Sequence, residues 1–105
     1  MTTFDEREHA FESKFARDAE LEFLAEAVRN KQIAYWAAEL MGKTASEAAQ
    51  YAKDLIRLDF QTQGHEEIVK KIAADLGDLA DEVTVRAKMA EFLKDARGKV
   101  IGPVA

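Results

Sequence analysis

Apolar residues recur every three to four positions through most of the 105-residue chain. This is the spacing of helices that bury one face. β-branched residues are few and apolar/polar alternation is lacking, so strands are not expected. The pattern predicts an all-α protein with helices over residues 19–41, 45–63, 65–76 and 82–97. Short turns between these helices favour antiparallel neighbours, which indicates a four-helix bundle over residues 19–98.

Glycines mark the predicted helix ends at Gly42, Gly64 and Gly98. The boundary at Gly77 is weaker, because the apolar rhythm continues through it. Two separate helices and one long helix over residues 65–97 both fit the pattern. A short apolar tail, residues 99–105, follows the last helix.

The inward faces of the predicted helices can be read from their spacing. The only tryptophan, Trp36, and Phe60 each lie on an apolar face and are expected inside the bundle. The other inward positions are Leu21, Leu24, Ala25, Val28, Ile33, Ala37, Leu40, Met41, Ala45, Ala48, Ala49, Ala52, Leu55, Ile56, Ile68, Val69, Ile72, Ala73, Leu76, Val85, Met89, Phe92, Leu93 and Ala96.

Residues 1–18 form an unusual N-terminal segment, predicted to be an amphipathic arm. Phe4, Phe11 and Phe15 have the spacing of one helix face, within a run of charged residues. One interpretation is that this stripe docks into a groove on a partner protein. The other is that the three rings cover the protein's own core. The sequence also leaves open whether the arm runs on into the next helix or hinges at Asp18.

Composition excludes several classes of protein. The formal net charge is −5, with Lys and Arg scattered among acids, so a nucleic-acid binder is not expected. No cysteine is present, which rules out disulfides and thiol chemistry. No apolar run reaches the length of a membrane span, and the N-terminus lacks the apolar region of a signal peptide. We therefore expect no direct membrane insertion.

Few residues suggest ligand chemistry. Arg29, Asn30 and Lys31 supply three consecutive donors that could hold phosphate oxygens, and Trp36 could stack on a base. The alternative is a solvated helix face beside a buried tryptophan. His65, before two glutamates, is typical of a helix N-terminus and lacks the spacing of a metal site. No catalytic grouping is apparent, so an enzyme is not expected.

Several segments together resemble the zeta subunit of the alpha-proteobacterial F1Fo-ATP synthase. They are Thr3-Phe4-Asp5-Glu6-Arg7-Glu8, Phe11-Glu12, Phe15-Ala16, Asp18, Glu20, Arg29-Asn30-Lys31, Trp36-Ala37-Ala38-Glu39-Leu40-Met41-Gly42, Tyr51-Ala52-Lys53 and Asp59-Phe60. The similarity covers nearly the whole chain and is densest over residues 3–42.

This resemblance implies a four-helix protein that inhibits ATP hydrolysis by the F1 sector. The inhibitory element would be the N-terminal segment, inserted between rotor and catalytic subunits, with Phe4, Arg7, Phe11, Lys14 and Phe15 as contact residues. The resemblance also implies ADP or ATP as a regulatory ligand, for which Arg29, Asn30, Lys31 and Trp36 are the candidates. No cofactor is required.

The same resemblance places the protein in the cytoplasm, at the inner membrane through F1. It is expected to be a monomer when free. An alternative function is a small adenine-nucleotide sensor whose partner is unrelated to the ATPase.

Overall fold

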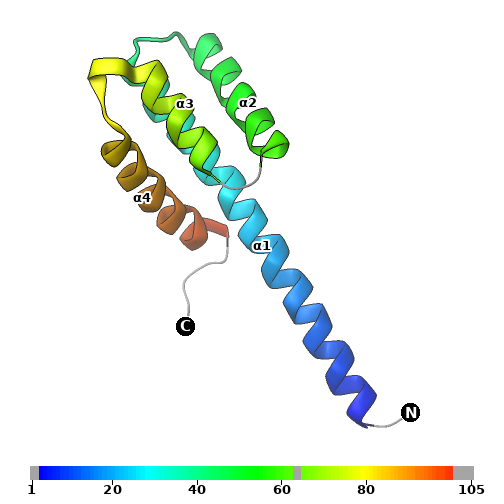
Figure 1. Cartoon of the computed structure of the whole chain (residues 1–105). Coiled ribbons are helices and arrows are strands. Elements are labelled where there is room, and N and C mark those ends of the chain that lie inside the picture. Colours follow the sequence, from blue (N-terminus) through cyan, green and yellow to red (C-terminus); the bar gives the residue numbers. More distant parts are fainter. Residues whose placement is uncertain (1–2, 63–64, 101–105) are drawn as a thin grey trace.

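The computed structural model describes the backbone of residues 3–62 and 65–100, and the side chains of residues 18–62 and 65–100. These residues form α1 (Thr3–Leu40), α2 (Ala45–Gln61), α3 (Glu66–Leu76), the short 3₁₀ helix η1 (Gly77–Leu79) and α4 (Glu82–Val100), with no strand among them. Successive α-helices run in alternating directions (Figure 1). The predicted all-α bundle is thereby confirmed.

Helix α1 is the spine of the molecule. It is one continuous helix from Thr3 to Leu40, so the backbone of the arm runs on into the bundle without a hinge at Asp18. Helices α2 and α4 pack against its C-terminal part, and α3 contacts both of them (Figure 1). The N-terminal part projects away from the bundle, and the molecule is accordingly elongated, measuring 62 × 31 × 27 Å.

The turn between α1 and α2 follows from local sequence signals. Gly42 has a φ of +71°, a conformation that glycine adopts without steric cost. The Gly42 and Lys43 amides donate to the Glu39 and Ala38 carbonyls, both at 3.0 Å. A capping box then starts α2: Thr44 Oγ1 accepts from the Glu47 amide at 3.2 Å, and a Glu47 carboxylate oxygen accepts from the Thr44 amide at 2.9 Å.

The open question at Gly77 is settled in favour of two separate helices. Gly77 has a φ of +56°, which ends α3 and begins the η1 turn. Asp81 then caps α4, because its carboxylate accepts from the Thr84 amide at 2.8 Å. This hydrogen bond lowers the pKa of the exposed Asp81 carboxyl below its usual value.

The predicted helix end at Gly98 is wrong, because α4 continues to Val100. A glycine inside a helix costs only about 1 kcal/mol relative to alanine, so it does not by itself force an end. Lys99 forms an ion pair with Asp95 at 3.1 Å, four residues earlier. Positive charge on Arg97 and Lys99 in the last turn also suits the negative end of the helix dipole.

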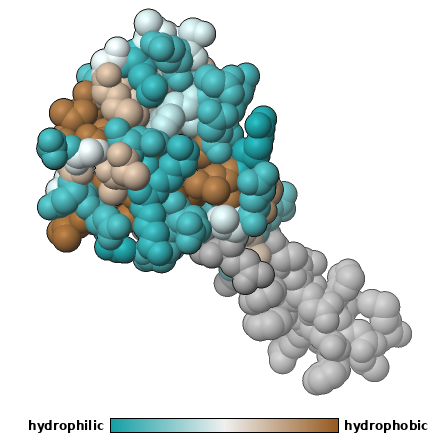
Figure 2. Space-filling view, turned by 45° about the horizontal axis from the view of Figure 1, so that its top comes forward, coloured by the Kyte–Doolittle hydropathy of each residue, from teal (hydrophilic) through white to brown (hydrophobic). Residues whose placement is uncertain are grey.

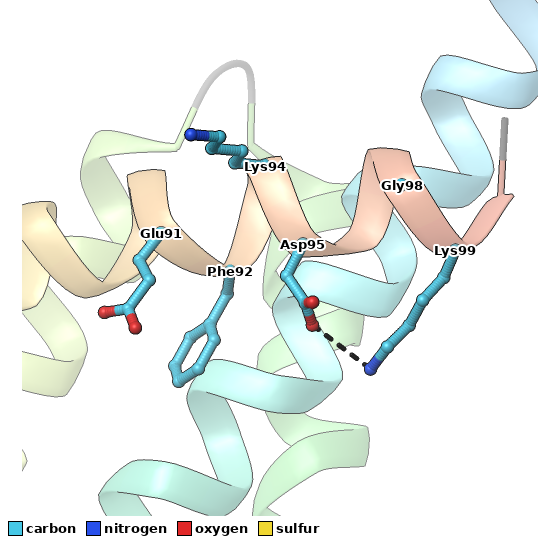
Figure 3. Close-up of a pocket in the computed structure, with 6 residues that line it drawn as sticks. All are labelled: Glu91, Phe92, Lys94, Asp95, Gly98 and Lys99. Carbon is cyan, nitrogen blue, oxygen red and sulfur yellow. Dashed lines mark ion pairs between the residues drawn. The ribbon is translucent and has the colours of Figure 1, made fainter. Parts of the chain in front are cut away.

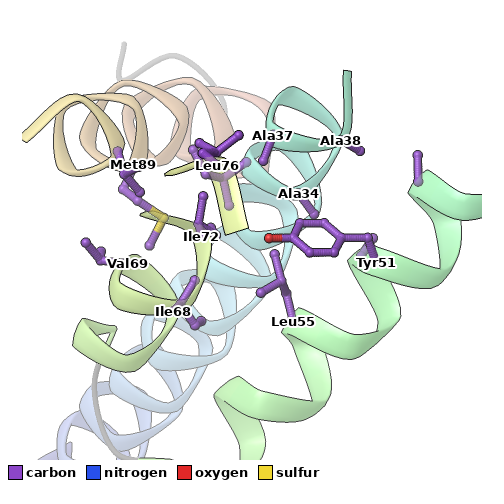
Figure 4. Close-up of a cluster of buried hydrophobic side chains, with 14 residues drawn as sticks. Ala34, Ala37, Ala38, Tyr51, Leu55, Ile68, Val69, Ile72, Leu76 and Met89 are labelled. Atoms are coloured by element: carbon purple, nitrogen blue, oxygen red, sulfur yellow. The ribbon is translucent and has the colours of Figure 1, made fainter. Parts of the chain in front are cut away.

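The core lies between the C-terminal part of α1 and the other three helices (Figure 4). Half of the predicted inward residues are buried and most of the others are half-buried. Ile33, Leu55, Ile68, Ile72 and Val85 are fully buried. The small residues Ala34, Ala37 and Ala38 on α1 allow close approach of α2. Tyr51 of α2 points toward this alanine surface in Figure 4, and its hydroxyl donates to Asp75 of α3 at 2.8 Å.

Several inward predictions are wrong. Leu24, Leu40 and Phe60 are 45%, 43% and 73% exposed, and Ala45 is exposed as well. These positions lie near the ends of the bundle or of a helix, where no neighbouring helix covers the predicted face. Apolar residues accordingly show at the surface of the bundle in several places (Figure 2). Trp36 is partly buried and packs against the core cluster without being fully enclosed.

Among residues 3–62 and 65–100, no helix combines the length and the apolar character needed to cross a bilayer.

Candidate functional site

The first candidate site is the N-terminal part of α1. The backbone is helical at Phe4, Arg7, Phe11, Lys14 and Phe15, the predicted contact residues, but their side chains lie outside the described residues. The helical backbone is consistent with the spacing from which a one-sided aromatic stripe is predicted. Their role as contact residues stays a prediction.

The four residues predicted to bind a nucleotide, Arg29, Asn30, Lys31 and Trp36, do not form one surface. Arg29 and Asn30 are turned into the bundle, with 2% and 1% of their surface exposed, whereas Lys31 is exposed. Trp36 lies further along α1 and packs against the apolar core. Of the four predicted ligand-binding residues, Arg29 and Asn30 are hydrogen-bonded to each other, whereas Lys31 lies on the outside of the bundle.

Arg29 and Asn30 belong to a polar network that links three helices. Arg29 Nε and Nη2 donate to Asn30 Oδ1 at 3.1 and 2.9 Å. Asn30 Nδ2 donates to Asp59 Oδ2 on α2 at 3.0 Å. Arg29 Nη2 also lies 2.8 Å from Nδ1 of His65, the residue that precedes α3. The His65 ring lies 3.5 Å from a carboxylate oxygen of Asp59 and 3.6 Å from one of Glu26.

Two carboxylates, those of Glu26 and Asp59, lie near the single guanidinium of Arg29 in this network. Burial lowers the pKa of the Arg29 guanidinium from its usual value, while the nearby carboxylates of Glu26, Asp59 and Glu22 oppose that shift. The guanidinium stays protonated, because arginine does not lose its proton in proteins. The network therefore orients α1, α2 and the start of α3 relative to one another at one end of the bundle.

Replacing Asn30 with alanine is expected to lower the free energy of unfolding by about 2 kcal/mol, because it leaves buried donors of Arg29 and a carboxylate oxygen of Asp59 without their partner. Urea denaturation measures the loss. Lys31→Ala is the matched control, since Lys31 is exposed on the next position of the same helix. Equal losses in the two variants would contradict a structural role for the network.

Several hollows lie on the surface of the described residues, and the following bear on the candidate site. A small cavity of about 70 Å³ lies beside Asn30 and is lined by Phe23, Glu26, Ala27, Asn30, Ile56, Asp59 and Phe60. A hollow of about 230 Å³ is lined by Arg29, His65, Glu66, Val69, Arg86, Met89, Ala90 and Leu93. An open groove of about 640 Å³ runs along α4 and is lined by Glu91, Phe92, Lys94, Asp95, Gly98 and Lys99 (Figure 3).

The groove on α4 does not resemble a ligand site. Its acidic and basic side chains alternate along one helix, and Asp95 and Lys99 already pair with each other (Figure 3). Within the described part of the chain, no group of three or more His, Asp or Glu side chains is arranged so that it could hold a metal ion. The second hollow is the one that brings Arg29 together with another guanidinium, that of Arg86.

Sequence reasoning missed Glu26, Asp59 and His65 as partners of Arg29. Glu26 lies three residues before Arg29 on α1, a spacing that places the two side chains near each other on a helix. Asp59 and His65 lie 30 and 36 residues away in sequence, so no local spacing relates them to Arg29. The sequence feature that could have indicated this network is the pair of polar residues Arg29 and Asn30 within an otherwise apolar stripe. Such residues are seldom buried without partners from other helices.

Comparisons with known proteins agree with this architecture. A structure solved by solution NMR is 37% identical to this chain and superposes on it with a TM-score of 0.69. The alignment covers 77% of this chain and 95% of the other. A search of curated proteins gave no match. The family model described as ATPase inhibitor subunit zeta matches residues 1–99. This match spans the arm and all four helices, and the chain therefore belongs to the ATPase inhibitor subunit zeta family.

Proposed function

We propose that this chain is a non-catalytic regulatory inhibitor of the F1 sector of ATP synthase, and that the N-terminal part of α1 is its inhibitory element. The observation that carries the proposal is the projection of α1 beyond the bundle (Figure 1). Among the residues whose side chains the structure describes, the first ion pair from α1 to another helix joins Glu22 to Arg97 of α4. Residues 3–21 have a helical rise of about 28 Å, which is long enough to enter a groove between subunits.

The proposed mechanism is a mechanical block. The arm inserts between rotor and catalytic subunits, Phe4, Phe11 and Phe15 fill apolar pockets, and Arg7 and Lys14 pair with acidic groups. The bundle is too wide to follow the arm and stays outside as a stop. A helix that is already formed loses less conformational entropy on binding than a flexible segment does, which favours affinity.

Purified F1-ATPase provides the direct test. Adding the full chain is expected to slow ATP hydrolysis in a dose-dependent way, while bovine serum albumin at the same concentration has no effect. Full hydrolysis at a large excess of the chain would refute the proposal. It would then favour a partner unrelated to the ATPase.

We also propose weak binding of ADP or ATP beside Arg29, in the hollow that Arg29 shares with Arg86 and His65. The resemblance to the zeta subunit supplies the ligand. Of the four residues predicted from sequence to bind it, Arg29 lines this hollow, whereas Asn30, Lys31 and Trp36 do not. Guanidinium groups hold phosphate oxygens well. Arg86 already pairs with Glu66 at 2.6 Å, so phosphate would compete with a carboxylate.

Titration with ADP is therefore expected to give a dissociation constant in the micromolar to millimolar range. Amide signals of residues 29–36, and of residues at the Arg86 hollow, should shift in NMR spectra of labelled protein. Added salt should weaken binding, because partly exposed charges are screened. Shifts confined to other helices would place any nucleotide site elsewhere.

A further inference from the structure

One end of the bundle surrounds the point where the arm of α1 emerges. Arg97, near the C-terminus of α4, donates to Glu22 on α1. His65, at the start of α3, lies beside Glu26, and Phe60, in the last turn of α2, lies beside Phe23. Three elements therefore end or begin at the level of residues 22–26 of α1, and we call this surface the arm-side end (Figure 1).

The arm-side end carries an exposed aromatic pair. The ring centroids of Phe23 and Phe60 lie 6.1 Å apart, with the rings tilted by 55°. Phe23 is 53% exposed and Phe60 is 73% exposed, and the neighbouring Leu24 is also exposed. The two rings border the small cavity beside Asn30. Aromatic residues are enriched at protein–protein interfaces, so a pair of rings exposed to water in the free protein is typical of a binding surface.

We propose that the Phe23–Phe60 pair is a second contact with the ATPase, at the mouth of the groove that receives the arm. The inference rests on the proposed function, because insertion of the arm is what brings this end of the bundle to the partner. Helix α1 has no break between the arm and Phe23, so the insertion depth of the arm also fixes the position of the pair. The occupant is an apolar surface of the receiving subunit.

Charge around the pair refines the chemistry of this occupant. Glu26 and Asp59 line the same cavity and keep about a third and a quarter of their side-chain surface exposed. A basic side chain beside the apolar surface of the partner would therefore complement them. The turn η1 and the start of α4 lie at the opposite end of the bundle from the arm (Figure 1). They carry the exposed apolar residues Leu79 and Val83, which would stay in solvent.

The test compares full-length variants in the inhibition of purified F1-ATPase. Changing Phe23 and Phe60 together to alanine should raise the concentration needed for half-inhibition about tenfold or more, as truncation of aromatic anchors usually does. The matched control, Leu79→Ala with Val83→Ala, removes exposed apolar surface at the opposite end and should leave inhibition unchanged. Circular dichroism melts confirm that each variant is folded.

A second measurement does not depend on the stability of the double variant. A photoreactive phenylalanine analogue at position 60 should cross-link to an F1 subunit, whereas the same analogue at position 83 should not. Unchanged inhibition by the double variant, together with no cross-link from position 60, would overturn the proposed contact. If the wild-type chain itself fails to inhibit, the proposed function fails first, so the two failures are distinguishable.

Discussion

A chain that lacks residues 1–17 is expected to lose all inhibition of F1-ATPase while its bundle stays folded. The core cluster runs from Ile33 to Met89, and among the described side chains Glu22 makes the first polar contact from α1 to another helix. Truncation would place Asp18 near the new helix start, and aspartate is a favourable N-cap residue. ATP hydrolysis should return to the uninhibited rate, and the cooperative thermal transition should remain.

The control for this deletion keeps the helix and removes only the aromatic stripe. Full-length chain with Phe4, Phe11 and Phe15 changed to alanine should also fail to inhibit, because the pockets of the partner would be left empty. A truncated chain without a cooperative melt would show instead that these rings are part of the core. In that case the docking interpretation of the stripe would be wrong.

Replacing Leu55 with alanine is expected to lower the free energy of unfolding by about 3–5 kcal/mol. Leu55 is fully buried in the centre of the core cluster, so the change removes apolar contacts and leaves a cavity. A domain of this size has only about 5–15 kcal/mol of stability, so the variant would unfold at a much lower urea concentration.

Phe60→Ala is the matched control, because Phe60 lies on the same helix and is largely exposed. We expect a loss below about 1 kcal/mol, in spite of the larger side chain that is removed. A loss as large as that of Leu55→Ala would show that Phe60 is buried in solution, and would also remove the basis for the second ATPase contact.

Helical spacing predicted the architecture because burial repeats every turn along most of each helix. Thus Leu55, Ile68 and Ile72 were correctly placed in the core from spacing alone. Phe60 was not, since its apolar face continues the pattern of α2 beyond the last turn that another helix covers. Periodicity shows which face is apolar, but it does not show where along that face the neighbouring helices end.

The candidate site was harder to predict for a different reason. Arg29 and Asn30 read as donors for a ligand, yet in the structure their donors are used by Asp59, His65 and each other. Those partners come from other helices, so only the three-dimensional arrangement brings them together. The arm shows the opposite case: its helical backbone was predictable from local sequence, whereas the proposal that it binds the ATPase rests on the family match and not on spacing.

The continuity of α1 has a consequence for how the chain can vary in length. Because the arm and the bundle share one unbroken helix, their relative rotation is fixed by the number of residues between them. Each residue inserted near Asp18 would rotate the arm by about 100° and advance it by about 1.5 Å. Only insertions close to whole turns, such as seven residues, would restore the orientation of the arm, and each would still lengthen its reach.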